Sequence, residues 1–141
     1  MIKGGTKMAI TQLSVFLENK PGKLYEVVKR ISEAGINLRA MTIAEVRDFG
    51  ILRIIVSDAK KAMEVLEDDH IITTTEVVSA VMEDKAGALY DILQALESAN
   101  VNIEYMYAYT GEVTGSANVV FRVDDIEGAE AQLREAGVQV L

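Results

Sequence analysis

The chain contains an internal repeat, and this repeat limits the folds that its 141 residues can adopt. The segment Glu18–Met41 aligns without a gap with Glu83–Met106, so that Gly22 corresponds to Gly87. Eight of the 24 aligned positions are identical, and they keep a loop, an amphipathic segment and an asparagine in the same order. Because such a repeat marks one supersecondary unit, the chain is predicted to contain two copies of one small fold.

The first copy is predicted to alternate strands and helices. Apolar residues alternate over Ile10–Leu17, as in a half-buried strand, and recur at helical spacing from Leu24 to Ile31. Gly35 then stands where a left-handed residue ends a helix, and its counterpart Asn100 also suits that conformation. The remaining predicted elements are strands at Ile36–Val46, Ile51–Val56 and Ile71–Thr75 and a helix at Ala59–Asp68.

The second copy predicts the same order. Its expected strands are Val77–Met82, Val101–Tyr109, Ala117–Val123 and Val138–Leu141, and its helices carry inward stripes of Leu89, Ile92, Leu93 and Leu96 and of Ile126, Ala129 and Leu133. Its hairpin turn, from Gly111 to Gly115, is expected to be one residue longer than that of the first copy, since Asp58 aligns with Asp124.

The order β-α-β-β-α-β is that of the ferredoxin-like motif. The predicted fold class is therefore α+β, with two ferredoxin-like βαββαβ units whose antiparallel sheets carry helices on one face. We place the first domain at residues 8–75 and the second at 76–141, after a polar N-terminal tail. No linker separates the copies, so Ile71–Met82 is expected to be nearly continuous extended chain and the units to share an interface.

Composition excludes several classes of function. The 14 Lys and Arg residues against 22 Asp and Glu give a net charge of −8, which disfavours nucleic acid and anionic membranes as partners. The chain has no cysteine and one histidine, His70, which leaves no thiolate site and no pair of imidazoles for a metal. No apolar run suggests a membrane span or a signal peptide, so we expect a cytoplasmic protein.

The sequence offers no catalytic constellation. Acid–base or nucleophilic catalysis needs a base held beside a reacting group, and the carboxylates here form no pair that both copies repeat. The acidic segment Glu67-Asp68-Asp69-His70 alone suggests a metal, and a solvated helix end is the better interpretation. We therefore expect no enzymatic activity, no cofactor and no metal site.

One repeated feature has chemical meaning, because each copy delivers a glycine to the start of its first helix. Glycine lets the backbone approach a ligand closely, and the first-turn N–H groups at the positive end of the helix dipole suit a carboxylate. The alternative is that Gly22 and Gly87 only turn the chain, while Asn19 and Asp84 cap the helices.

Two further sets of residues remain open to more than one interpretation. Asn37 and Asn102 begin the strand after each first helix, where asparagine is commonly a turn residue. Tyr105, Tyr107 and Tyr109 alternate along one strand, which indicates core or interface packing more than a ligand pocket.

The segment Asn19-Lys20-Pro21-Gly22-Lys23-Leu24, with the helix and the Gly35-Ile36-Asn37-Leu38 that follow it, closely resembles the ACT domain. The second copy resembles it less strictly, because Ala86 replaces the proline and Asn100 the glycine. The whole chain is similar to stand-alone tandem ACT proteins, whose ligands are amino acids bound between two ACT units. The resemblance implies a ligand site at Asn19, Pro21, Gly22, Lys23, Leu24 and Asn37 and at Asp84, Ala86, Gly87, Ala88, Leu89 and Asn102.

Two functions follow from the resemblance. The first is a regulatory protein that binds a free amino acid and transmits its binding to a partner enzyme of amino-acid metabolism. The second is an interaction subunit without a ligand, similar to the small subunit of acetolactate synthase. Either protein is expected to be a homodimer or larger homo-oligomer, because ferredoxin-like sheets leave edge strands exposed. We expect the first copy to bind more readily, since Lys20 and Lys23 flank its loop.

Overall fold

The computed structural model describes residues 10–111 and 114–141, and these residues divide into two compact units. One unit comprises Thr11–Thr75, and the other comprises Glu76–Leu141 together with Ile10. The predicted domain start at residue 8, the N-terminal tail and positions 112 and 113 of the second hairpin turn lie outside the described residues.

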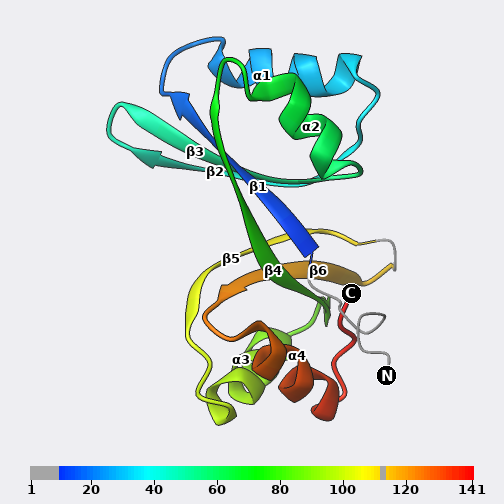
Figure 1. The fold of residues 1–141 in the computed structure, drawn as a ribbon. Coiled ribbons are helices and arrows are strands. Elements are labelled where there is room, and N and C mark those ends of the chain that lie inside the picture. Colours follow the sequence, from blue (N-terminus) through cyan, green and yellow to red (C-terminus); the bar gives the residue numbers. More distant parts are fainter. Residues whose placement is uncertain (1–9, 112–113) are drawn as a thin grey trace, which may run out of the picture. The chain divides into compact units, whose positions relative to one another are not determined.

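The first unit has the predicted order of strands and helices. Its elements are β1 (Ile10–Glu18), α1 (Lys23–Glu33), β2 (Leu38–Val46), β3 (Phe49–Val56), α2 (Ala59–Leu66) and the beginning of β4 (Ile71–Glu83). The strands lie in the order β2-β3-β1-β4, and the pairs β1–β3 and β2–β3 are antiparallel. Both helices cover one face of this sheet (Figure 1).

The core of the first unit lies between that face and the two helices. Leu13, Val15 and Leu17 point into it from β1, as the alternating pattern predicts, and meet Val27 and Ile31 of α1. Fully burying an aliphatic side chain contributes roughly 1.5–3 kcal/mol, so this stripe is what holds α1 on the sheet. The start of α1, and with it the loop after β1, is thereby fixed against the sheet.

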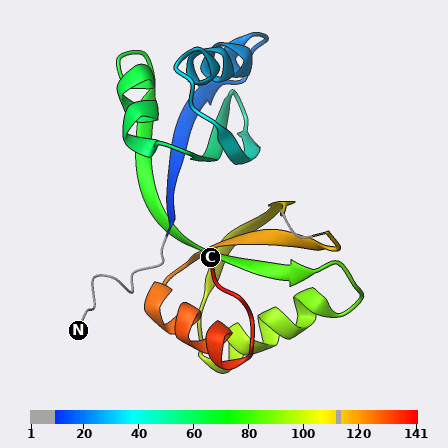
Figure 2. The same ribbon diagram turned by 90° about the vertical axis from the view of Figure 1, so that its right-hand side faces the viewer.

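The second unit repeats this arrangement with the end of β4, α3 (Ala88–Ser98), β5 (Ile103–Thr110), β6 (Ser116–Val123) and α4 (Ile126–Glu135). Its strands lie in the order β5-β6-β4, and α3 and α4 share one face (Figure 2). The expected last strand, Val138–Leu141, is reduced to a single bridge between Val140 and Ala80. Thus both units have the α+β architecture predicted from the repeat.

β4 is one uninterrupted strand from Ile71 to Glu83, which confirms the nearly continuous extended chain expected over Ile71–Met82. One detail of the sequence analysis needs correction. In α3 the inward stripe consists of Ala88, Ile92, Ala95 and Leu96, while Leu89 is exposed. The predicted left-handed residues after α1 and α3 are confirmed, with φ of 75° at Gly35 and 58° at Asn100.

The second hairpin is longer than predicted. Met41 pairs with Ile54, whereas its counterpart Met106 pairs with Phe121, so the second copy has two more positions between the paired residues. The equivalent of Asp58 is therefore Asp125 and not Asp124. The structure supports this alignment because Asp58 and Asp125 cap α2 and α4 in the same way.

None of the helices in the described part of the chain is long and apolar enough to cross a membrane.

Replacing either capping aspartate is expected to destabilise its own unit. The carboxylate of Asp58 accepts a hydrogen bond from the N–H of Lys61 at 3.1 Å, and that of Asp125 from Gly128 at 3.0 Å. Asp58→Ala and Asp125→Ala should each lower the free energy of unfolding by about 1 kcal/mol in urea titrations. The control is Asp68→Ala, at an exposed aspartate that caps no helix. This substitution should change the free energy of unfolding by less than about 0.5 kcal/mol.

Candidate functional site

The loop after the first strand has the same backbone geometry in both units. Gly22 and Gly87 stand at the N-cap position with φ of 88° and ψ of −13° and −11°, a left-handed conformation that favours glycine. Neither helix receives a side-chain hydrogen bond at its cap. The alternative that Asn19 and Asp84 cap the helices is therefore wrong.

Asn19 instead ties this loop to the tip of the neighbouring hairpin. Its backbone N–H donates to the carbonyl of Asp48 at 2.7 Å, and its side-chain amide donates to the carbonyl of Arg47 at 3.4 Å. The N–H of Asp84 donates to Gly115 in the same way, at 2.8 Å. Each glycine loop thus lies at the hairpin end of its sheet.

The uncapped helices leave backbone donors open. The N–H of Lys23 reaches the carbonyl of Lys20 at 3.3 Å, and that of Glu26 begins the helical ladder at Gly22. Between them, the N–H groups of Leu24 and Tyr25 meet no acceptor among the described residues, and the same holds for Leu89 and Tyr90. Two neighbouring donors at the positive end of a helix form a site for a carboxylate.

A cavity of about 290 Å³ opens beside the first loop, and every residue around it belongs to the first unit. Leu17, Leu24 and Ile43 supply apolar walls, and Glu18, Lys20 and Glu45 supply charge. Asn19, Ala44 and Gly50 complete the lining. Leu24 belongs both to this cavity and to the open first turn, so the cavity lies beside the start of α1.

The two loops differ in charge. In the first, Glu18 pairs with Lys20 at 3.3 Å and with Lys23 at 3.6 Å, so two ammonium groups face one carboxylate. The hydrogen bond from Lys20, and then the charges of Lys20 and Lys23, hold the pKa of Glu18 below its ordinary value. The two lysines therefore flank Gly22 as predicted, and both of them pair with Glu18.

In the second loop, Lys85 is the only described residue that pairs with Glu83, at 3.3 Å. Ala88 replaces the second lysine, and Asp84 adds a carboxylate where the first loop has the neutral Asn19. The potential at the start of α3 is thus less favourable for an anion than that at the start of α1. Pro21 and Ala86, the residues just before each glycine, are both exposed.

Asn37 and Asn102 lie away from these loops, at the opposite end of α1 and α3. The 11 residues of α1 give a helix about 16 Å long, which separates Asn37 from Gly22. The N–H of Asn37 donates to the hydroxyl of Ser57 at 2.9 Å, and that of Asn102 to the carboxylate of Asp124 at 3.0 Å. Both hydrogen bonds come from backbone N–H groups, and they tie the residue after each first helix to the segment that follows β3 or β6.

The three tyrosines lie on the sheet face away from α3 and α4. Met106, between Tyr105 and Tyr107, packs into the core with its partner Phe121, so the alternating tyrosines point the other way. All three are half-buried, and the hydroxyl of Tyr109 hydrogen-bonds that of Ser79 at 3.3 Å.

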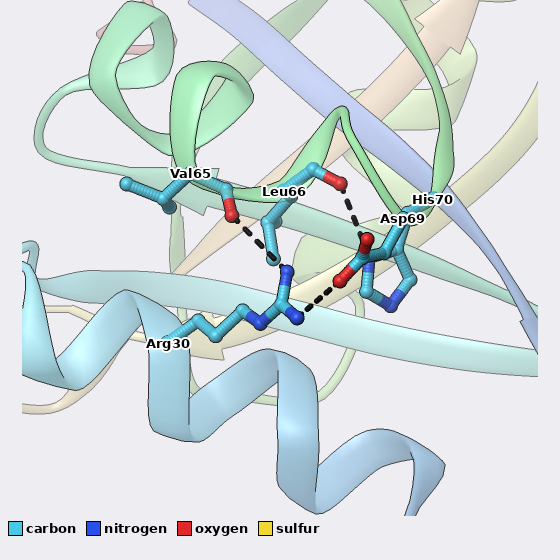
Figure 3. Close-up of polar contacts among 5 residues, drawn as sticks. All are labelled: Arg30, Val65, Leu66, Asp69 and His70. Atoms are coloured by element: carbon cyan, nitrogen blue, oxygen red, sulfur yellow. Dashed lines mark hydrogen bonds and ion pairs between the residues drawn. The ribbon is translucent and has the colours of Figure 1, made fainter.

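The acidic segment after α2 is a helix end, as predicted. The sequence analysis did not predict that this segment forms an ion pair with α1 (Figure 3). Arg30 of α1 forms an ion pair with Asp69 and donates to the carbonyl of Val65 at 3.4 Å. The ring Nδ1 of His70 lies 3.1 Å from the carbonyl of Leu66. Within the described ranges, no group of three or more acidic, histidine or cysteine side chains is placed to hold a metal ion.

Comparison with known families agrees with this architecture. A family model described as an ACT domain pair matches residues 8–140, nearly the whole chain. The chain therefore belongs to the family of ACT domain pairs.

Individual relatives extend this result. A crystal structure of a protein from Bacteroides thetaiotaomicron is 42% identical and superposes with a TM-score of 0.89, covering 95% of this chain and 92% of that one. The ligand-free regulatory subunit of aspartate kinase from Thermus thermophilus is 21% identical with a TM-score of 0.69, covering 92% and 94%, and shows the same fold. An aspartokinase of Corynebacterium glutamicum is 28% identical over 84% of this chain, which spans only 31% of that enzyme.

The ion cluster at the first loop predicts a measurable shift in a pKa. Removing a neighbouring cation makes the Glu18 carboxylate easier to protonate, so Lys20→Met should raise the pKa of Glu18. Lys23→Met should raise it by less, because Lys20 supplies the larger effect. NMR titration of the side-chain carboxyl carbon measures both pKa values. Lys85→Met, in the other unit, is the matched control and should leave Glu18 unchanged; a larger effect of Lys23→Met would contradict the assignment.

Proposed function

We propose that this protein is a regulatory protein that senses a free amino acid at the start of α1. The observation that carries the proposal is the pair of unbonded N–H groups at Leu24 and Tyr25, next to a cavity of about 290 Å³. A carboxylate bound there completes the hydrogen bonding of the first helical turn without needing a basic side chain.

The cavity supports an amino acid better than a simple carboxylate. Glu45 offers negative charge for the ammonium group, since Glu18 already pairs with two lysines, and the side chain of the ligand would pack against Leu17, Leu24 and Ile43. Asn19, Pro21, Gly22, Lys23 and Leu24 are the proposed ligand-binding positions of the first copy. Their counterparts in the second copy are Asp84, Ala86, Gly87, Ala88 and Leu89. This second position should bind a carboxylate more weakly, because Asp84 adds a negative charge and Ala88 replaces a lysine. Asn37 and Asn102 are left out of the proposed site.

We propose a regulatory rather than a catalytic role in the cytoplasm, with residues 8–75 and 76–141 as the domain limits. Membership of the ACT domain pairs supports this role, as does the similarity in fold to an aspartate kinase regulatory subunit. The proposed partner is an enzyme of amino-acid metabolism. Regulation then requires that the amino acid bind one conformation of the complex more tightly than another.

We further propose that the protein is a homodimer or a larger homo-oligomer. β2 lies at the edge of its sheet, and its side chains Met41 and Ile43 are 40% and 49% exposed. An exposed strand edge with apolar side chains favours pairing with another chain. Sedimentation of a species of 15.4 kDa at high concentration, with and without amino acids, would exclude this association.

An interaction subunit without a ligand is the second candidate, and one surface favours it. A groove of about 480 Å³ runs along the outer side of α1, between Leu24, Tyr25 and Val28, and Tyr25 is 69% exposed. An exposed apolar groove of this kind is a feature of protein interaction sites. In that case no free amino acid should bind, whereas a partner enzyme should still associate.

The two candidates predict different responses to amino acids. If one binds, saturation at about a hundred times its Kd should stabilise the protein by roughly 2.7 kcal/mol, which raises the melting temperature by several degrees. A screen of the common amino acids by thermal unfolding, followed by equilibrium dialysis of those that shift the transition, measures this. A complete absence of shifts and of binding would favour the interaction subunit.

A pair of matched glycine variants locates the site. Gly22→Val and Gly87→Val impose nearly the same backbone strain, because the two glycines share φ and have almost equal ψ. Gly22→Val should abolish the shift in melting temperature caused by the amino acid, whereas Gly87→Val should largely retain it. Circular dichroism of both variants without ligand checks that they remain folded. Loss of the shift in Gly87→Val alone would place the site in the second copy.

A further inference from the structure

A second cavity, of about 320 Å³, lies in the second unit between the end of β4, the start of α3 and the segment after α4. Val81, Met82, Ile92 and Val138 give it apolar walls. Glu83, Lys85 and Asp91 are the charged residues of its lining, and Ala88 also faces it. All these residues lie within one unit, so the cavity does not depend on a neighbouring part of the chain.

The internal repeat shows which side chain is missing from this cavity. Glu83, Lys85 and Ala88 are the counterparts of Glu18, Lys20 and Lys23. In the first unit the stem of Lys23 carries its ammonium group to within 3.6 Å of the Glu18 carboxylate. In the second unit position 88 has only a methyl group, which is 8% exposed and lies against the cavity.

The loss of that lysine also leaves a charge imbalance. Glu18 pairs with two lysines, but among the described residues Glu83 pairs with Lys85 alone, at 3.3 Å. With Asp91, the cavity lining holds two carboxylates and one ammonium group. A lysine side chain has an apolar stem and a cationic end, and the second cavity offers surroundings for both.

We propose that this cavity binds a small aliphatic primary amine, a monoamine or a diamine, in its protonated form. The ammonium group takes the place that Lys23 Nζ has in the first unit and pairs with Glu83. The alkyl chain lies over Ala88, against the apolar walls. This site is separate from the carboxylate site at Gly22, and it stands or falls independently of the proposed function.

The direct test is a titration of the protein with n-butylammonium, which has the length of a lysine side chain. At pH 7 this amine is cationic, as lysine is. Backbone amide NMR signals of Ala88, Asp91 and Val138 should shift in a saturable way. 1-Butanol, its neutral counterpart, should cause no saturable shift, and 1,5-diaminopentane shows whether a second ammonium group adds affinity.

Exchanging the residues between the two copies gives matched variants. Ala88→Lys supplies the missing side chain from the protein itself and should abolish binding. Lys23→Ala should create a second amine site beside Glu18, seen as new shifts in the first turn of α1. Glu83→Gln should weaken binding by about two- to fivefold, because it removes the charge of a carboxylate that is largely exposed to water, whereas Glu18→Gln should leave binding unchanged.

Equal binding of 1-butanol would overturn the proposal. Unchanged binding to Ala88→Lys, in a protein whose spectrum shows it to be folded, would also overturn it, and so would shifts that map away from the cavity. Loss of binding in Glu18→Gln but not in Glu83→Gln would likewise assign the amine to the first unit and contradict the inference.

Discussion

Each unit depends on a sharp reversal between its first strand and its first helix. The helix must return over the sheet to bury its apolar stripe, and in both units a left-handed residue stands at this junction. Gly22 and Gly87 provide this turn with φ of 88°. Because glycine has no side chain to cap a helix, the same turn leaves two N–H groups open at the helix start. The requirement for packing thus creates the open N–H groups on which the proposed carboxylate site rests.

The hairpin end of the first sheet completes that site. Asn19 does not cap the helix but holds the hairpin tip through Arg47 and Asp48, which sets β2 beside the loop. Ile43 and Glu45 of β2 then face Leu24 across a cavity. At the other end of α1, Arg30 connects the helix to the end of α2 through Asp69 and Val65 (Figure 3). α1 is therefore anchored at the end away from the proposed site, while the N–H groups of Leu24 and Tyr25 in its first turn remain without an acceptor among the described residues.

Duplication followed by divergence has given one backbone two chemistries. Ala88 stands where the first unit has Lys23, so the start of α3 has one cation fewer, and the Ala88 methyl group lies against the second cavity. The exchange of Asn19 for Asp84 changes the charge in the same direction. The first loop therefore suits an anion, and the cavity beneath the second suits a cation. Each copy serves as the internal control for experiments on the other.

The sequence by itself determined the repeat, the order of strands and helices, and the left-handed positions at Gly35 and Asn100, because these depend on local periodicity and on residue-specific backbone preferences. It also predicted the glycine loops, since the same short segment occurs twice. The tertiary structure decided where side chains from distant segments meet. Asn37 and Gly22 are 15 residues apart along the chain, and they lie beyond opposite ends of α1. Arg30 and Asp69 are 39 residues apart and form an ion pair. Such contacts depend on how the helices pack over the sheet, and residue spacing along the chain does not encode those distances.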